Sequence, residues 1–224
     1  MDWTAFSLSL QLAAWTVGLL LPIAILIARL LAWGDFRGKS LLEALIMLPL
    51  VLPPTVLGFY LLVAFSPQSG FGAFVQTLFG GKLVFSFAGI VIASLIINLP
   101  FAVQPIQRAF EAIPRNVREA AFVSGLSRWE TMRRIELPLA WPGLISAVAL
   151  TFAHTLGEFG VILMIGGSIP GETRVLSISI YDSVQAFRID QAAVMSAVLL
   201  VFSITAIAIV HMLARRPKVG AHGA

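Results

Sequence analysis

Five long stretches of the chain carry no charged side chain. A bilayer core needs about 20 apolar residues as a helix, and each stretch contains a window of that length, although the second is apolar enough only up to about Phe65. No stretch alternates strictly between polar and apolar residues, so helices are favoured over the strands of a membrane barrel. The stretches run from Trp3 to Ala28, Ala44 to Gly81, Leu83 to Gln107, Leu137 to Gly157 and Gln191 to Ala214.

The composition also indicates an integral membrane protein. Of the 224 residues, 58% are hydrophobic and only 12% are charged, whereas soluble domains keep about 25% of their residues charged. So few charges cannot cover a water-facing surface, which excludes a soluble enzyme. The chain has no cysteine, so disulfides, thiolate metal sites and a cysteine nucleophile are excluded as well.

We therefore predict an all-α integral membrane protein that forms one domain over residues 1–224. We expect the first span to stay in the protein and not to be a cleaved signal peptide, because no Lys or Arg precedes it and it is longer than an h-region. Segment 174–190 contains Asp182, so we expect a re-entrant or interfacial helix there, with a sixth span as the alternative. Segments 66–70 and 79–82 are expected to form turns. The five predicted spans are about 5–32, 44–65, 83–107, 137–160 and 191–214.

Lys and Arg fall unevenly on the two sides that five spans create. One side has 12 of the 15: three around the first connection, six in the connection 108–136, and three in the tail 215–224. Only Lys82, Arg174 and Arg188 fall on the other side. Because basic residues are retained on the cytoplasmic face, we expect the N-terminus outside and the C-terminus inside. This topology accounts for the net charge of +4, and we expect no nucleic-acid partner.

The connection 108–136 has the pattern of two short helices. Asn116 is the expected N-cap of the first, with Glu119 three residues later completing a capping box and Gly125 as its C-terminal stop. Ser127 begins a second helix with the same N-cap pattern. A merely amphipathic surface helix is the alternative to a docking helix. The first helix would present a small apolar face to the outside of the bilayer, formed by Ala120, Ala121, Val123 and Leu126.

The same connection carries a motif. Its fixed positions resemble the EAA motif of binding-protein-dependent ABC importer permeases of the type I class, so we call residues 108–136 the EAA loop. The resemblance implies a MetI-like fold and a homodimer of permeases bound to two ABC ATPase subunits, each receiving a coupling helix from the EAA loop. Carried over from the motif, the docking residues are Glu119, Ala120, Ala121 and Gly125, while Ile135, Leu137 and Pro138 would set where the loop joins the fourth span.

Further segments resemble one branch of this family. Segment 49–58 in the second span, Thr-Leu-Gly-Glu-Phe-Gly at 155–160 and Ile-Pro-Gly-Glu-Thr at 169–173 are similar to the molybdate permeases, with the sulfate permeases as a sister branch. The resemblance implies import of molybdate, with tungstate as a related anion, by alternating access. Sulfate or thiosulfate import is the alternative. It also implies an extracytoplasmic molybdate-binding protein and a bacterial inner-membrane location.

Energy for uptake must come from a partner subunit. Gly38-Lys39-Ser40 ends like a P-loop, but the Gly required five residues before Gly38 is replaced by Trp33. We therefore expect Gly38 to be a turn residue, no cofactor on this chain, and ATP with Mg at the partner ATPase. An intramembrane enzyme would need a Ser-His, paired-Asp or metal constellation, which the spans lack. A structural assembly factor is a further alternative, and it would bind no ATPase.

An anion crossing the bilayer needs hydrogen-bond donors or a water-filled path. His154 and Glu158 share a helix face at i and i+4. No third ligand lies at a matching spacing, which disfavours a metal site or proton relay. We therefore favour a polar pair that faces the dimer interface. Gating by the charge of Glu158 is a further hypothesis. Prolines in the spans act as packing kinks or, alternatively, as hinges. The candidate residues for the path or gate are Pro53, Pro54, Thr55, Asn98, Thr151, His154 and Glu158.

Overall fold

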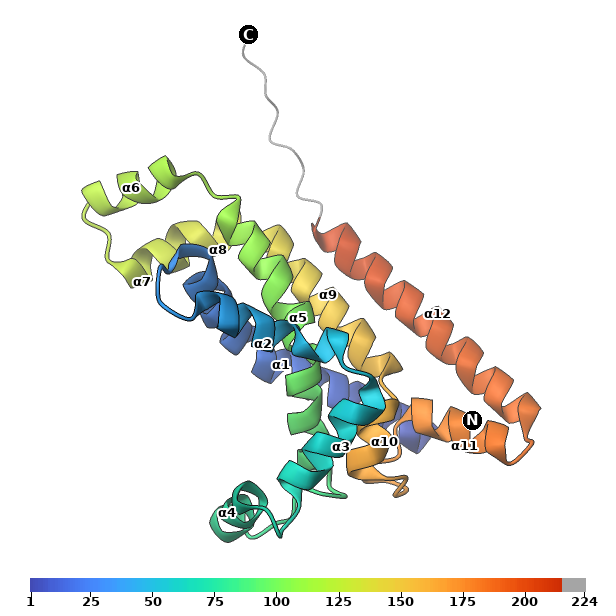
Figure 1. Ribbon diagram of the computed structural model, residues 1–224. Coiled ribbons are helices and arrows are strands. Elements are labelled where there is room, and N and C mark those ends of the chain that lie inside the picture. Colours follow the sequence, from blue (N-terminus) through green and yellow to red (C-terminus); the bar gives the residue numbers. More distant parts are fainter. Residues whose placement is uncertain (215–224) are drawn as a thin grey trace.

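The computed structural model describes residues 1–214, and the predicted tail 215–224 lies outside the described residues. The described part is almost entirely helical (Figure 1). In chain order its helices are α1 (Trp3–Trp33), α2 (Lys39–Val51), α3 (Pro54–Phe65), α4 (Gly70–Phe79), α5 (Phe87–Glu111), α6 (Arg115–Val123), α7 (Arg128–Thr131), the π-helix η1 (Met132–Glu136), α8 (Leu137–Leu139), α9 (Trp141–Gly157), α10 (Gly160–Gly166), α11 (Leu176–Gln185) and α12 (Ile189–Ala214).

Three helices, α1, α5 and α12, are long and apolar enough to cross a membrane on their own. Two bent pairs meet the same criterion if each is taken as one span: α2 with α3, and the run 128–139 with α9. The predicted all-α membrane fold is therefore confirmed, with up to five spans. The segment 174–190 holds the ten-residue helix α11, which is too short to cross a bilayer.

The predicted span 44–65 is not one straight helix. The chain bends by 113° from α2 to α3. Leu52 between them has an extended backbone with ψ 136°, which is the usual conformation of a residue before proline. Neither Pro53 nor Pro54 can donate the backbone hydrogen bond that would continue α2. The proline pair therefore makes a corner in this segment.

α5 lies at the centre of the bundle and packs against α1, α2, α9 and α10. One apolar cluster, which includes the fully buried Ile90 and Ile162, surrounds its first half. A second cluster, which includes the fully buried Phe110, surrounds its other half. The contact between α5 and α9 requires glycine, because a Cβ on Gly143 would lie 2.4 Å from the Cβ of Ala109. The central helix is thereby fixed to its neighbours over its whole length.

Two short helices were not anticipated from the sequence. The predicted turns at 66–70 and 79–82 are present, and α4 lies between them with Phe71, Phe74 and Leu78 exposed. α10 follows a break at Glu158–Phe159, and it packs against α3 and α5 with Val161, Ile162 and Ile165 buried. The helix within the predicted span 137–160 begins at Trp141 and ends at Gly157.

Candidate functional site

α6 is the first helix of the EAA loop and projects from one end of the bundle (Figure 1). Its N-cap is Pro114, whose extended backbone (φ −59°, ψ 138°) starts the helix and whose carbonyl accepts the N–H of Val117 at 3.1 Å. Asn116 consequently lies inside the first turn. The predicted capping box of Asn116 with Glu119 is therefore wrong, and α5 continues four residues into the loop, to Glu111.

The end of α6 follows the prediction for Gly125. This glycine has a left-handed backbone with φ +82°, a conformation that costs other residues about 1–2 kcal/mol. Its N–H donates to the carbonyl of Phe122 at 3.0 Å, and the N–H of Leu126 donates to the carbonyl of Ala121 at 3.1 Å. These two bonds form a Schellman motif, which closes the helix and turns the chain.

The second helix begins as predicted. The Ser127 hydroxyl accepts the N–H of Glu130 at 3.2 Å, and a Glu130 carboxylate oxygen accepts the N–H of Ser127 at 3.0 Å. This reciprocal capping box starts a helical run that passes through η1 to Leu139. The run then bends by 72° into α9, with Ile135 and Leu137 half-buried and Pro138 exposed just before the bend.

The outward face of α6 differs from the predicted one. Val123 is 89% exposed and Phe122 is 41% exposed, and Glu119 and Ala120 are exposed beside them. Ala121 is only 4% exposed because it lies on the side of α6 that faces the rest of the loop. The prediction that Ala121 belongs to the outward face is therefore wrong, while Phe122 was missed.

Glu136 holds α6 to the membrane-spanning helices, and the sequence did not single it out. Its side chain is fully buried and forms ion pairs with two arginines. Nε of Arg29, on α1, lies 2.6 Å from one carboxylate oxygen, and Nε of Arg118, on α6, lies 2.8 Å from the other. A buried charge is tolerated when it is paired and hydrogen-bonded in this way. Glu136 thus joins α1, η1 and α6.

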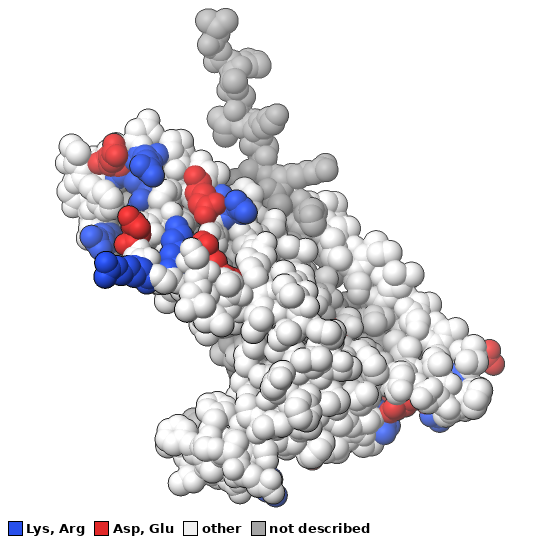
Figure 2. All heavy atoms as spheres, in the orientation of Figure 1, with Lys and Arg blue, Asp and Glu red and all other residues white. Residues whose placement is uncertain are grey.

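A second contact strengthens the attachment of α6. The Arg118 guanidinium carbon lies 3.9 Å from the ring centroid of Trp33, at the end of α1. This cation–π contact uses the face of Arg118 while its edge bonds Glu136. Figure 2 shows Lys and Arg gathered over the end of the molecule that carries α6 and α7, where acidic side chains lie among them. Because Arg118 contacts Trp33, a shift of α6 would directly displace the end of α1.

Inside the bundle, a chain of polar side chains connects α1, α5 and α9. The Thr16 hydroxyl donates to the Ser94 hydroxyl at 3.0 Å, and the amide nitrogen of Asn98 donates to the backbone carbonyl of Ser94 at 2.8 Å. The amide oxygen of Asn98 then lies 3.1 Å from Nδ1 of His154. Phe101 stacks on the His154 ring with centroids 4.1 Å apart. Asn98 and His154, two predicted path residues, are thus brought together.

Glu158 ends this polar chain at the break between α9 and α10. One carboxylate oxygen lies 3.7 Å from Nε2 of His154, and the other accepts the N–H of Val161 at 3.4 Å. The Glu158 side chain is 8% exposed, so its carboxylate is buried within its own chain, whereas the His154 side chain is 32% exposed. That this pair faces a second copy stays a prediction. Pro54 lies close by, since a Cβ on Gly160 would be 3.0 Å from the Cβ of Pro54.

Of the remaining predicted path residues, one is buried in the bundle and two are exposed. Thr151 is buried on α9, one turn before His154, and its hydroxyl has no hydrogen-bond partner among the described residues. Pro53 and Thr55 are exposed at the corner between α2 and α3. Within residues 1–214, no group of three His, Asp or Glu side chains is arranged to hold a metal ion. The polar chain itself contains no Lys or Arg.

These features define a multi-pass helical membrane protein with a projecting helical loop at its basic end. The chain matches the family model described as "Binding-protein-dependent transport system inner membrane component" over residues 20–219, and it belongs to this family. The predicted family is thereby confirmed.

Relatives agree with this assignment, and a solved structure shares the fold. The chain is 48% identical over 202 residues to the molybdenum transport system permease protein ModB of Azotobacter vinelandii, covering 90% of this chain and 89% of that protein. It is 32% identical over 201 residues to a probable sulfate transport system permease of Chlorella vulgaris, covering 90% and 75%. A bacterial ABC transporter involved in import of the acidic polysaccharide alginate shares the fold, with a TM-score of 0.78, 19% identity and coverage of 96% and 79%.

Proposed function

We propose that this chain is the membrane-spanning subunit of an ATP-driven importer of molybdate, with tungstate as a related substrate. The observation that carries the proposal is the 48% identity to a molybdenum transport permease over 90% of the chain. The sulfate permease relative is only 32% identical over a similar length. Sulfate or thiosulfate import is therefore the less favoured alternative.

In this proposal two ATPase subunits supply the energy and bind ATP with Mg, while two copies of this chain form the pathway. The exposed face of α6, with Phe122 and Val123, is the proposed ATPase contact, because two large apolar side chains project there beyond the end of the bundle. Movement of α6 would pass through Arg118 and Glu136 to Arg29 on α1. ATP-driven closure of the ATPases would thereby alter the packing of the spanning helices and open the pathway to the other side.

The polar chain that ends at Glu158 is the proposed path or gate. It offers hydroxyl, amide and imidazole groups but no cation, so it would hold an oxyanion only loosely. Loose binding supports the proposal that recognition is done by an extracytoplasmic molybdate-binding protein. Glu158 adds a negative charge beside His154, which would repel the anion in the closed state.

We also propose an inner-membrane orientation with the N-terminus outside and the C-terminus and α6 inside. The uneven distribution of Lys and Arg supports it. The chain has no cysteine, so single cysteines can report the side directly. Val123→Cys should react with a membrane-impermeant maleimide only after cell permeabilisation, whereas Gln68→Cys, between α3 and α4, should react in spheroplasts. The reverse pattern would contradict the orientation.

Substrate choice is tested by ATPase activity in proteoliposomes that contain the permease, its partner ATPase and the binding protein. Molybdate and tungstate should each stimulate ATP hydrolysis, and sulfate at the same concentration should not. Stimulation mainly by sulfate or thiosulfate would assign the chain to the sister branch. Failure of any ATPase to associate with the permease would overturn the proposed function altogether.

A further inference from the structure

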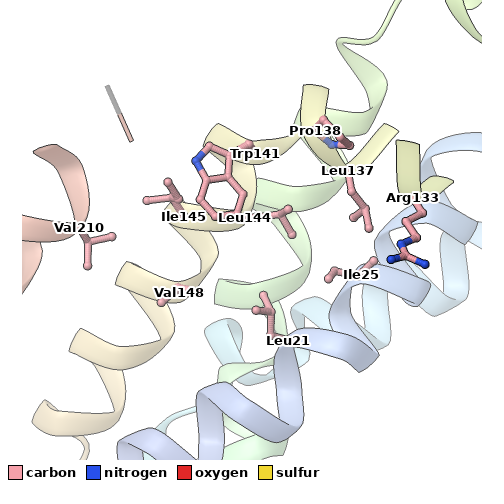
Figure 3. Close-up of a pocket in the computed structure, with 10 residues that line it drawn as sticks. All are labelled: Leu21, Ile25, Arg133, Leu137, Pro138, Trp141, Leu144, Ile145, Val148 and Val210. Carbon is pink, nitrogen blue, oxygen red and sulfur yellow. The ribbon is translucent and has the colours of Figure 1, made fainter. Parts of the chain in front are cut away.

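A cavity of about 560 Å³ lies between α1, α9 and α12, next to the bend that leads into α9 (Figure 3). This volume falls within the range of small-molecule sites. Its walls are apolar, with Leu21 from α1, Val148 from α9 and Val210 from α12 among them. α1 and α12 are each long and apolar enough to cross a membrane, and α9 is so together with the run 128–139. We therefore expect the apolar walls to lie at membrane depth, where lipid hydrocarbon would fill the cavity.

One charged side chain lines this cavity. Figure 3 shows Arg133 on the opposite side from Val210, with the Trp141 ring between them. Arg133 is exposed, and it has no hydrogen bond or ion pair with any of the described residues. The neighbouring Arg134 does not line the cavity. It also has an ion-pair partner, because its guanidinium nitrogen lies 3.9 Å from a Glu130 carboxylate oxygen. The cavity therefore combines an apolar trough with one unpaired cation.

Further basic residues follow α12 in the sequence. α12 contributes Val210 to the cavity, and Arg215, Arg216 and Lys218 follow it within eight residues, with no Asp or Glu in 215–224. Basic residues directly after a spanning helix attract anionic lipid headgroups. Tryptophan and tyrosine favour the headgroup level of a bilayer, and Trp141 lines the same cavity as Arg133.

We propose that this cavity binds one anionic phospholipid, with the headgroup phosphate at Arg133 and an acyl chain along the trough between α9 and α12. The occupant is a lipid because the trough is apolar at membrane depth and only its end is charged. It is an anionic lipid because the charge is positive and unpaired within residues 1–214. The bound lipid would fill the space between α1, α9 and α12, next to the bend that leads into α9.

The test is native mass spectrometry of the full-length permease purified in detergent with equal phosphatidylglycerol and phosphatidylcholine. The wild-type protein should retain phosphatidylglycerol in preference to phosphatidylcholine. Arg133→Gln should reduce retained phosphatidylglycerol about fivefold, the factor for one cation near an anionic surface. Arg134→Gln, the matched control, should retain it at the wild-type level. Equal retention by the Arg133→Gln variant, or no preference in the wild type, would overturn the proposal.

A second pair of variants tests the apolar part of the cavity. Val148→Trp fills the trough and should reduce retention of both lipids, whereas Leu150→Trp, at an exposed position outside the cavity, should not. Thermal unfolding of each variant establishes that it folds. If Val148→Trp instead dissociates the dimer and leaves lipid retention unchanged, the cavity is covered by a second copy and the proposal is wrong. The readout is lipid binding, so it is independent of transport and of ATPase association.

Discussion

Nε of Arg118 on α6 lies 2.8 Å from a carboxylate oxygen of Glu136, although the two residues are 18 positions apart. The same carboxylate bonds Arg29 on α1. A helix that projects from the bundle is thus held by one buried acid to the first spanning helix. A force on α6 can therefore reach α1 through Glu136, in addition to the direct contact of Arg118 with Trp33.

Replacing Glu136 by Ala should lower the free energy of unfolding by about 2 kcal/mol. Removing one partner of a fully buried ion pair costs about 3–5 kcal/mol, but Arg29 and Arg118 keep 23% and 19% of their side chains exposed and so regain some solvation. Thermal unfolding of the purified permease measures this. Glu111→Ala, which removes an exposed carboxylate from the same loop, should change stability by less than about 0.5 kcal/mol.

Glu136→Gln should weaken the coupling of ATP hydrolysis to anion uptake, even if the variant folds normally. In Glu136→Gln the side chain keeps its shape but loses its charge, so α6 is held less firmly to α1. We expect ATP hydrolysis by the assembled complex to continue while anion uptake per ATP falls severalfold. Equal ratios of uptake to hydrolysis in the variant and the wild type would exclude a coupling role for Glu136.

Val123→Asp should abolish ATPase association without destabilising the permease. Val123 is 89% exposed, so the permease loses no packing, but a charge would enter the proposed apolar contact. Co-purification of a tagged ATPase measures the association. Ala112→Asp adds the same charge at an exposed position before α6 and should leave co-purification intact. Loss in both variants, or in neither, would contradict the assigned surface.

Gly125→Ala should lower stability by about 1 kcal/mol because its backbone is left-handed. Nothing lies within 4 Å of the added methyl group, so the effect isolates backbone strain. Gly18→Ala is the matched control: its methyl group also meets nothing within 4 Å, and its place inside α1 favours alanine. A cost in Gly18→Ala as large as that in Gly125→Ala would contradict this account.

Asn98→Leu should reduce transport and lower stability by about 1–3 kcal/mol, the cost of leaving a buried polar partner unpaired. The substitution removes the acceptor of His154 Nδ1 and the donor to Ser94. Thr205→Val on α12 removes an exposed hydroxyl that bonds only the carbonyl of Val201 among the described residues, and it should be nearly neutral. Uptake assays together with thermal unfolding separate the two effects.

Glu158→Gln tests the gate. If the carboxylate helps to close the path by repelling the anion, the variant should hydrolyse ATP faster than the wild type in the absence of binding protein, or should leak anion. Unchanged transport together with unchanged ATPase coupling would exclude gating, and would leave Glu158 with the capping role shown by its bond to the N–H of Val161.

Local patterns predicted much of the fold. Charge-free windows located the helices and bent helix pairs that are long and apolar enough to cross a membrane. Gly125 and Ser127 correctly predicted one helix end and one helix start in the EAA loop. These features depend on neighbours within a few residues. The corner at Pro53–Pro54 was visible only as a hinge hypothesis, because the angle of 113° depends on how α3 packs against α10.

The ion pairs of Glu136 could not be read in the same way, since Arg29 is 107 residues away. One signal was available: Arg29 lies inside the predicted first span, 5–32, and a charge within a span needs a partner. Ala121 was misplaced because the outward face was assigned from the apolar residue types of the expected helix, which do not tell the side of α6 on which each residue lies.

The most direct test of the central claim is uptake of labelled molybdate into proteoliposomes that contain this permease with its ATPase and binding protein. The account predicts saturable accumulation that requires ATP, is competed by tungstate and is not competed by equal sulfate. No ATP-dependent accumulation of molybdate, with sulfate transported in its place or with no anion transported, would contradict it.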